Sequence, residues 1–481
     1  MSILLFSVFQ IVAQSHPALD RFLGASYLRG ASISIMVKDV NSDSVICSYD
    51  AEREVIPASA LKIVTTSAAL EILGENYVYE TSILYDGEII DSILNGNLYI
   101  RGGGDPSLGS ADLGADRDMV LHEWVEAVRT AGIRTITGAV IADESIFDTE
   151  GVSMKWLRED LGSYYGQGCY GLNIYDNRYA LYLKTEAPGE SPKIERTDPE
   201  LIPPVVFHNH LTCSQISSDS TYIVGFPFSN ERYIYGIVPA NRSSYKLVGD
   251  IPEPALFIAH YFSKLLKKED ISIACEPTCR RILAQAGNRN PLTECKTLIT
   301  TYSRPLKDLV KIANFESNNL YADAFLKTIG LKYAGNEPLS SFGKGVKILL
   351  KHWQEKGLDT SSLWMFDGSG LAPTDKITAR CLNDILGYMA VKSPTGQAFI
   401  ESLPRAGIEG TVRRTLVNSP LKGHIRLKSG SMSRIRSYAG YITKNDRIYA
   451  VTIIVNNFNC TQSQIKSDIE RLISGISDFR F

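Results

Sequence analysis

Strand-like patterns of apolar and polar residues occur near the two ends of the chain. Near the N-terminus, residues 31–40 alternate in polarity and a second strand-like segment, 44–49, follows a short polar turn; near the C-terminus, strand-like patterns return at 424–428, 437–443 and 447–455. Because successive side chains of a strand point to opposite faces, a period of two is typical of half-buried strands. We expect the first two and the last three strands to form one antiparallel sheet covered by helices.

A helical period appears between these strands and at the end of the chain. Pro57 precedes the apolar segment 59–73 and Gly74 follows it, which is the usual punctuation of a helix. That segment is apolar on nearly all sides, so we expect it inside a domain. We expect the last helix to pack onto the sheet with its apolar side, rather than to anchor on a membrane surface. The further predicted helices are 119–131, 255–268, 306–331, 343–356 and 463–476.

The pattern of predicted elements and the composition of the chain change between residues 77 and 252. Short strand-like runs are separated there by turns rich in Gly, Pro, Asp and Ser. This change predicts that 77–252 is an insertion with mostly β structure of its own. The segments 16–76 and 253–481 would then form one discontinuous domain. The predicted fold is therefore α/β (α+β), an antiparallel sheet flanked by helices with mostly β inserted domains.

The first fifteen residues read MSILLFSVFQIVAQS, a short apolar run that ends in small residues. Ala13 and Ser15 are typical of the cleavage site of a secretory signal, although the basic residues that usually precede such a run are missing. We predict an export signal over 1–15 and hence a periplasmic or cell-envelope location. The alternative is a buried N-terminal helix. No transmembrane span is expected, because no run of about 18 uninterrupted apolar residues occurs.

The composition is that of an ordinary globular protein and argues against nucleic-acid binding. The chain has 44% apolar residues and a formal net charge of −3, without the basic excess that phosphate binding needs. Its eight cysteines contain no CxxC, so we expect unpaired thiols, with one disulfide as the alternative. His208 and His210 have no readable third ligand, so a surface strand is expected there and no metal.

The first candidate for chemistry is a serine and a lysine one helical turn apart, Ser59 and Lys62. A serine hydroxyl becomes a good nucleophile when a base removes its proton. A lysine can be that base if burial or a neighbouring cation lowers its pKa. The spacing alone is a weak signal, but only Ser59 lies in a strongly apolar helix, where an unused lysine would be costly. The same spacing occurs at Ser243, Ser341, Ser419 and Ser463.

Two later triplets strengthen this candidate. The triplet 317–319 (Ser-Asn-Asn), in a predicted helical region, offers a second hydroxyl for proton relay and an amide that could hold a peptide. The triplet 428–430 (Lys-Ser-Gly), at the end of a strand, offers a positive charge, a hydroxyl and a glycine that lets a substrate lie close. Ser-x-x-Lys, Ser-x-Asn and Lys-[Ser/Thr]-Gly in this order form the set of penicillin-binding proteins and β-lactamases.

On these motifs the chain resembles the class C low-molecular-mass penicillin-binding proteins, which are D-alanyl-D-alanine carboxypeptidases and endopeptidases. The resemblance covers roughly residues 30–460. That family inserts extra domains between its first two motifs, in agreement with the expected insertion. Further matching segments are 96–106 (GNLYIRGGGDP), 367–371 (DGSGL), 403–407 (LPRAG) with Gly410-Thr411, and 439–441 (AGY).

The resemblance implies an acyl-enzyme mechanism. Ser59 attacks the carbonyl carbon of a D-alanyl peptide bond, and Lys62 is its base. Ser317 relays a proton to the leaving amine, while Asn319 holds the substrate amide. Lys428 keeps Lys62 deprotonated by repulsion and attracts the terminal carboxylate of the substrate.

The third motif also supplies binding groups in this scheme. The backbone N–H groups of Ser59 and Ser431 form the oxyanion hole, and the hydroxyls of Ser429 and Ser431 bind the carboxylate. Gly430 leaves room for the substrate. The expected partners are peptidoglycan peptides, with β-lactam antibiotics as covalent inhibitors, and no cofactor is needed. The competing interpretations are a β-lactamase and a non-catalytic peptidoglycan-binding protein.

The resemblance also implies a specificity site in the insertion. Family members place an Asp after a Trp there, where it meets the side-chain amine of diaminopimelate. Asp160 follows Trp156 in this chain, and Tyr165 matches a neighbouring aromatic residue. Many relatives carry an arginine after the segment 367–371, but Ala372-Pro373 follow here. Recognition of the diaminopimelate carboxylate therefore stays open.

Overall fold

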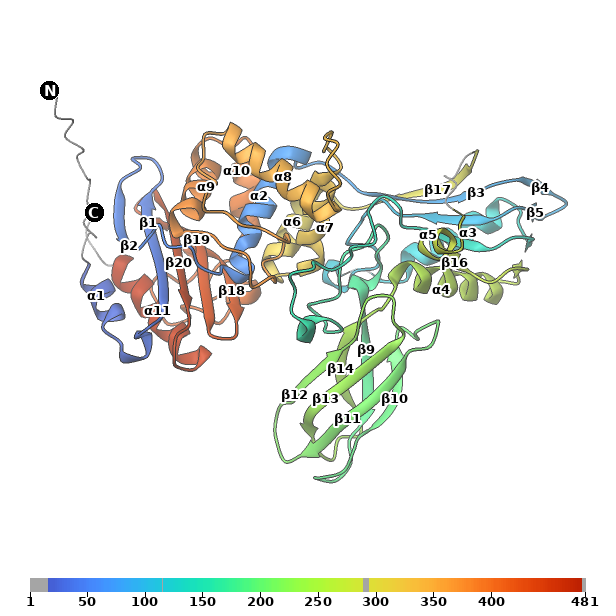
Figure 1. Ribbon diagram of the computed structural model, residues 1–481, viewed down its shortest axis with the longest axis horizontal. Coiled ribbons are helices and arrows are strands. Elements are labelled where there is room, and N and C mark those ends of the chain that lie inside the picture. Colours follow the sequence, from blue (N-terminus) through green and yellow to red (C-terminus); the bar gives the residue numbers. More distant parts are fainter. Residues whose placement is uncertain (1–15, 115, 289–293, 478–481) are drawn as a thin grey trace.

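The computed structural model describes residues 16–114, 116–288 and 294–477. The predicted export signal at 1–15 lies outside these residues. The molecule has two parts (Figure 1): a five-stranded antiparallel sheet with helices on both faces, and an elongated part that contains the other sheets of the described residues. In this α/β arrangement the predicted fold class is confirmed.

The five-stranded sheet joins the two ends of the chain. Its order is β18-β19-β20-β1-β2, and every neighbouring pair is antiparallel. The prediction of one antiparallel sheet from the first two and the last three strands is therefore confirmed. The strands are β1 (Ser32–Asp39), β2 (Val45–Tyr49), β18 (Ile425–Met432), β19 (Ile435–Lys444) and β20 (Arg447–Asn456).

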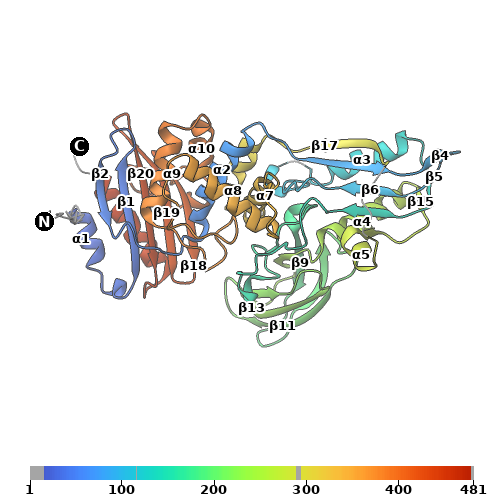
Figure 2. The same cartoon turned by 45° about the horizontal axis from the view of Figure 1, so that its top comes forward.

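A bundle of helices covers one face of this sheet (Figure 2). α2 lies at its centre, and all residues from Lys62 to Leu70 are buried, as expected for a helix that is apolar on nearly all sides. The bundle consists of α2 (Lys62–Leu73), α6 (Leu306–Phe315), α7 (Asn319–Gly330), α8 (Ser341–Glu355), α9 (Ala379–Val391) and α10 (Gly396–Ser402).

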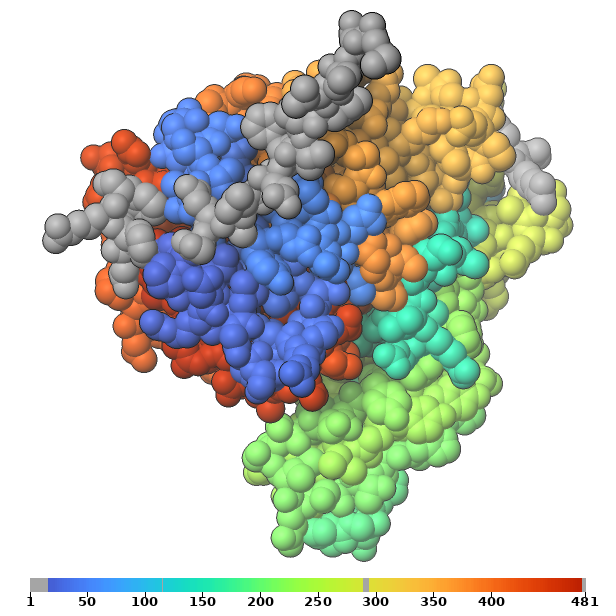
Figure 3. Space-filling view, turned by 60° about the vertical axis from the view of Figure 1, so that its left-hand side comes forward, coloured from blue at the N-terminus to red at the C-terminus, as the bar shows by residue number. Residues whose placement is uncertain are grey.

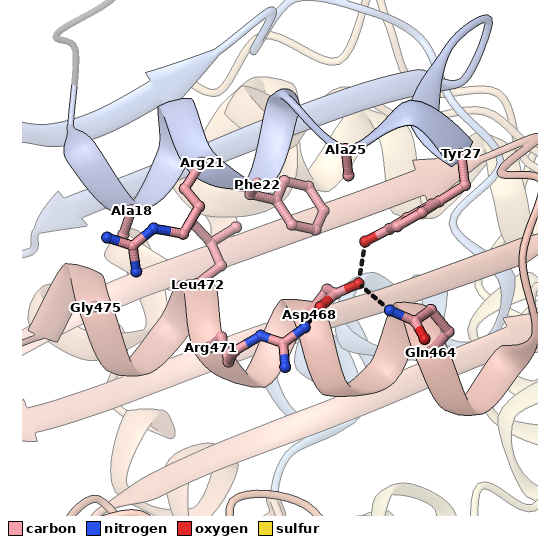
Figure 4. A pocket seen from close by; sticks show the side chains of 10 residues that line it. All are labelled: Ala18, Arg21, Phe22, Ala25, Tyr27, Gln464, Asp468, Arg471, Leu472 and Gly475. Atoms are coloured by element: carbon pink, nitrogen blue, oxygen red, sulfur yellow. Dashed lines mark hydrogen bonds and ion pairs between the residues drawn. The ribbon is translucent and has the colours of Figure 1, made fainter.

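The other face of the sheet is covered by α1 (Pro17–Leu23) and α11 (Gln462–Ser477). Ile465, Ile469 and Ile473 of α11 are buried against the sheet, so the predicted packing of the last helix is confirmed. Figure 4 shows the pocket between these helices, where Asp468 accepts hydrogen bonds from Tyr27 and Gln464. The pocket therefore lies on the face of the sheet that is turned away from α2.

The insertion begins with two small sheets, of order β16-β8-β6-β3-β17 and β15-β7-β5-β4. The apolar faces of helices α3 and α4 pack into the same core as these strands. The strands are β3 (Glu80–Tyr85), β4 (Glu88–Ile90), β5 (Ile93–Asn95), β6 (Leu98–Arg101), β7 (Thr135–Ile136), β8 (Val140–Asp143), β15 (Ser272–Ile273), β16 (Thr278–Cys279) and β17 (Lys296–Tyr302), and the helices are α3 (Met119–Thr130), α4 (Pro254–Lys268) and α5 (Arg280–Gln285).

A β-sandwich follows within the insertion. Its sheets have the orders β10-β9-β14 and β11-β13-β12, and their inner side chains share one apolar core. Figure 3 shows this lobe in green, standing out from the rest of the molecule. Its strands are β9 (Arg178–Lys184), β10 (Lys193–Asp198), β11 (Val206–Ser214), β12 (Ser220–Val224), β13 (Glu231–Pro239) and β14 (Tyr245–Asp250).

The strands after residue 252 bear on where the predicted insertion ends. β15, β16 and β17 pair with β7, β8 and β3, and α4 packs against the same sheets. The helical period of 255–268 identifies a helix but does not show which sheet its apolar face covers. We therefore propose that the insertion runs from about 77 to about 304, and that 16–76 and the chain after 304 form the discontinuous domain.

Three smaller expectations can be compared with the described residues. Cys275 and Cys279 are free thiols, in agreement with unpaired cysteines. His208 and His210 lie on β11, where their rings stack on Tyr233 and Tyr235 of the neighbouring strand. No helix in the described part of the chain is long and apolar enough to cross a membrane.

Candidate active site

Ser59 lies on a tight turn at the start of the central helix. The turn is the 3-10 segment η2 (Ala58–Leu61), and α2 begins at Lys62, so the predicted single helix over 59–73 is divided at this point. Ala58 has a φ of +47°, which is unusual for a residue with a side chain. Strained backbone of this kind is often retained at functional sites.

The side chain of Lys62 is fully buried and makes three polar contacts. Its Nζ lies 3.0 Å from Ser59 Oγ, 2.6 Å from Asn319 Oδ1 and 2.7 Å from the carbonyl oxygen of Ser369. Only the Ser59 oxygen among these three can also donate a proton. A neutral amine has two N–H groups and one lone pair, so it could donate to Asn319 and Ser369 while it accepts the Ser59 proton.

Burial makes that neutral form more accessible than in an exposed lysine. Burial lowers the pKa of Lys62 to about 8, although the charges of Asp323, Asp367 and Asp375 act in the opposite direction. The pKa of Lys428 is also lowered, chiefly by burial and further by the positive charges of Lys62 and Arg436. The positive charge of Lys62 thus lowers the pKa of Lys428, whereas burial alone lowers the pKa of Lys62, and burial is the largest cause of the shift at both amines.

Ser317 lies between two helices rather than within one. The predicted helix 306–331 is wrong in this respect, because α6 ends at Phe315 and α7 begins at Asn319. Ser317 has a φ of +58°, which no regular right-handed helix can contain. Both helices bury their apolar sides in the same core. The helical spacing of apolar residues therefore continues across the break, and the sequence pattern does not reveal where the helix is interrupted.

Lys428 approaches Ser317 from the edge strand β18. Its Nζ donates to Ser317 Oγ at 2.8 Å and to the carbonyl oxygen of Ser429 at 2.9 Å. The three motifs therefore meet, since Asn319 contacts Lys62 and Ser317 contacts Lys428.

Gly430 and the two serines beside it shape the strand at this point. A Cβ atom at Gly430 would lie 2.7 Å from the carbonyl oxygen of Pro57, so the glycine allows β18 to lie against the Ser59 turn. Ser429 Oγ donates to Thr411 Oγ1 at 3.0 Å, and the side chain of Ser431 is exposed. Thr411 belongs to a segment that the sequence singled out without assigning it a role.

The insertion contributes Asp160 and Tyr165. Asp160, in the 3-10 turn η4 (Arg158–Asp160), is 7% exposed, and its Oδ2 has no hydrogen-bond partner among the described residues. Burial raises the pKa of Asp160; burial and the Asp160 charge raise the pKa of Tyr165 to about 12. The carbonyl oxygen of Tyr165 accepts a hydrogen bond from Asn319 Nδ2 at 2.8 Å. This loop thus contacts the same asparagine that contacts Lys62.

Two groups around Lys62 were not identified from the sequence. The segment 367–371 was recognised only as a matching motif, whereas Ser369 supplies a carbonyl acceptor for Lys62. Asp323 lies one helical turn after Asn319 on α7, and its Oδ1 accepts from the N–H of Gly368 at 2.8 Å. The i, i+4 spacing of Asn319 and Asp323 is the only signal that could have found it.

Fold and motifs together define a serine peptidase of the penicillin-binding type, and comparison with known proteins identifies the family. The D-Ala-D-Ala carboxypeptidase 3 (S13) family matches residues 16–476. The chain belongs to this family, which confirms the resemblance stated from the motifs and the prediction of a serine-type D-Ala-D-Ala carboxypeptidase.

Two relatives of known name match most of the chain. A D-alanyl-D-alanine carboxypeptidase of Actinomadura is 26% identical over 457 residues, which are 91% of this chain and 80% of that protein. The carboxypeptidase DacB of Haemophilus influenzae is 25% identical over 418 residues, which are 86% of this chain and 83% of that protein. The crystal structure of penicillin binding protein 4 from Haemophilus influenzae has the same fold, with a TM-score of 0.80 at 22% identity over 96% of this chain and 99% of that one.

Proposed function

We propose that this chain hydrolyses D-Ala-linked bonds of peptidoglycan stem peptides, as a carboxypeptidase and DD-endopeptidase, through an acyl-enzyme on Ser59. The observation that carries the proposal is the contact of Ser59 with a fully buried lysine, 3.0 Å between Oγ and Nζ, whose pKa is lowered to about 8. Such an amine can take a proton near neutral pH, which a solvent-exposed lysine cannot.

Acylation follows from the contacts of the two serines. Lys62 takes the proton of Ser59 Oγ, which attacks the carbonyl carbon of the D-alanyl peptide bond. The bond from that carbon to the leaving nitrogen then breaks, and Ser317 passes a proton to the leaving amine. Ser317 is suited to this step because it accepts a hydrogen bond from Lys428 Nζ, which can replace the proton.

The backbone stabilises the negative oxygen formed on the way. The N–H groups of Ser59 and Ser431 are the proposed oxyanion hole, since β18 lies directly against the Ser59 turn. Each such donor contributes roughly 2.7–4 kcal/mol to the stabilisation of a transition state. Before the second half of the reaction, Lys62 gives up the proton that it took from Ser59, which restores the one that Lys428 and Ser317 lost. Water then attacks the ester carbon with neutral Lys62 as the base, and Lys62 returns the proton to Ser59 Oγ as the bond from that carbon to Oγ breaks and the shortened peptide leaves.

The terminal carboxylate of the substrate has a second effect on the two lysines. Lys428, with the hydroxyls of Ser429 and Ser431, is the proposed carboxylate site. A carboxylate within about 4–6 Å of an ammonium group favours the charged form of that group. A charged Lys428 then repels a proton on Lys62, so substrate binding itself favours the basic form of Lys62.

The insertion selects the substrate by binding the lysine or diaminopimelate side chain of the stem peptide. Asp160 offers a buried carboxylate oxygen without a partner among the described residues, which fits a side-chain ammonium group. Tyr165, Trp156 and Ala372 belong to an apolar cluster next to it, which fits the aliphatic part of a lysine or diaminopimelate side chain.

β-Lactam antibiotics should acylate the same serine, since the related penicillin binding protein 4 has been crystallised in complex with a β-lactam. A periplasmic or cell-envelope location agrees with a peptidoglycan substrate. The family match favours neither a β-lactamase nor a non-catalytic binding protein.

Digestion of defined muropeptides, crosslinked and uncrosslinked, tests this function. The wild type should release D-Ala or separate crosslinked peptides, and Ser59→Ala should do neither. Activity that persists in Ser59→Ala would contradict the proposal.

A further inference from the structure

We propose that Trp156 of the insertion is a positioning residue for Lys62 and acts through Asp367. The insertion would then be part of the machinery that activates Ser59, in addition to selecting the substrate. The inference rests on the proposed function, because it assigns Lys62 as the base.

The first step is a buried hydrogen bond between the two parts of the molecule. Trp156 Nε1 donates to Asp367 Oδ2 at 2.6 Å, and both side chains are buried. The indole also packs against Leu371 and Ala372, which follow Asp367 in the chain. A charge-assisted hydrogen bond of this kind holds its partners in a narrow geometry.

The second step is the turn that Asp367 organises. Its Oδ1 accepts the backbone N–H groups of Ser369 and Gly370 at 3.0 and 2.6 Å, and its Oδ2 also accepts that of Ala372 at 2.8 Å. One carboxylate thus fixes the backbone of the turn 368–372. The Trp156 N–H is its only side-chain donor from the insertion among the described residues.

The third step joins this turn to the lysine. The carbonyl oxygen of Ser369 accepts from Lys62 Nζ at 2.7 Å. Gly368, next to it, is held through both of its backbone groups, because its N–H donates to Asp323 at 2.8 Å and its carbonyl accepts from Thr65 at 2.7 Å. A rotation of the Asp367 carboxylate would therefore change the direction in which Ser369 holds Lys62.

A parallel link acts on the other fixed acceptor of Lys62. Asn319 Oδ1 accepts from Lys62 at 2.6 Å, while Asn319 Nδ2 donates to the carbonyl oxygen of Tyr165 at 2.8 Å. Of the two acceptors that direct Lys62 toward Ser59, Asn319 donates directly to the insertion loop 156–165, and Ser369 is linked to that loop through Asp367. The indole N–H is the link that a substitution can remove without deleting an aromatic ring.

The test compares Trp156→Phe with Trp124→Phe. Trp124 is also a buried tryptophan of the insertion, and its Nε1 donates one hydrogen bond, to Thr301 at 2.9 Å. Each variant loses one indole N–H, but only Trp156 is linked to Lys62. The probe is 6-aminopenicillanic acid, a β-lactam without the side chain that would reach the insertion. Stopped-flow measurements separate its dissociation constant from the rate constant of acylation.

We expect the acylation rate constant of Trp156→Phe to fall about tenfold, with the dissociation constant within about twofold of wild type. Trp124→Phe should acylate at the wild-type rate. Equal acylation rate constants for the two variants would overturn the inference, because Trp156 would then have only a structural role. This holds even if both variants have a lower thermal midpoint than wild type. Failure of the wild type itself to acylate would instead contradict the proposed function.

Asp367→Asn provides the second variant if Trp156→Phe does not fold. The amide keeps one carbonyl oxygen for the N–H groups of Ser369 and Gly370, but its nitrogen accepts neither from the Trp156 N–H nor from the backbone N–H of Ala372. It should show at least the same loss of acylation rate. Acylation of Asp367→Asn at the wild-type rate would overturn the inference.

Discussion

Lys428 Nζ lies 2.8 Å from Ser317 Oγ and joins an edge strand to the break between two helices. Lys62 and Ser59 form a second pair of the same kind, 3.0 Å apart, on the other side of the site. Each serine therefore has its own buried amine. Burial lowers the pKa of both amines, and the charge of Lys62 lowers that of Lys428 further.

This arrangement predicts how acylation depends on pH. Acylation requires neutral Lys62, whose pKa in the free enzyme is lowered to about 8, so the second-order rate constant of acylation, which reports the free enzyme, should rise with pH and level off above about 8. Below that value it should fall about tenfold per pH unit. Stopped-flow acylation by benzylpenicillin from pH 5.5 to 9.5 measures this. A rate constant that does not change with pH, or one that still rises toward 10.5, the ordinary lysine value, would contradict the assignment of Lys62.

Lys428 should determine the preference for a free carboxylate. The second-order rate constant for acylation of the wild type should be about 10–100 times higher with benzylpenicillin than with its methyl ester. The reason is that a hydrogen bond to a charged group contributes about 1.5–3 kcal/mol. Lys428→Ala should lose most of this preference as well as rate. If the variant keeps the wild-type ratio between the two compounds, the carboxylate is bound elsewhere.

Asp160 should affect peptides with a side-chain amine and leave compact β-lactams unaffected. Asp160→Asn is expected to lower kcat/KM about tenfold for a stem peptide with a free ε-amino group, because a charge-assisted contact is lost. The N-acetylated peptide should be cleaved equally by both enzymes, and acylation by 6-aminopenicillanic acid provides the control. An equal loss on both peptides would argue against a contact with the amine.

Gly370 should be intolerant of any side chain. Its φ is +77°, and a Cβ atom there would collide with the carbonyl oxygen of Ala58, next to the nucleophile. We expect Gly370→Ala to destabilise the protein by about 1–3 kcal/mol and to slow acylation. Gly357→Ala is the matched control, because its φ is +82° and no atom lies within 4 Å of the added Cβ. Equal thermal midpoints and equal acylation rates for the two variants would contradict this view.

The sequence was informative where periodicity and side-chain chemistry carry the signal. The strand-like patterns of β1 and β20 predict strands, and both strands are buried on both faces because helices cover each side of their sheet. Ser59 and Lys62 could be selected because a lysine in an apolar helix needs a function. The motifs give the order of the serine, asparagine and lysine groups, and the structure brings them together.

Other features could not be read from the chain. The break at Ser317 depends on a positive φ at a residue that is not glycine, and helical periodicity does not detect it. β17 pairs with β3, which is far from it in the chain, and no local sequence pattern predicts which strand is the partner. Lys62 donates to the backbone carbonyl oxygen of Ser369. Every residue has such a carbonyl, so the residue type at position 369 does not predict this contact.

The most direct test of the central claim is to identify the residue that β-lactams acylate. Wild type and Ser59→Ala are incubated with benzylpenicillin, and intact-protein and peptide mass spectrometry locate the adduct. The account predicts one penicilloyl group on the peptide that contains Ser59, and none on the variant. An adduct on any other residue, or an equal adduct on Ser59→Ala, would contradict it.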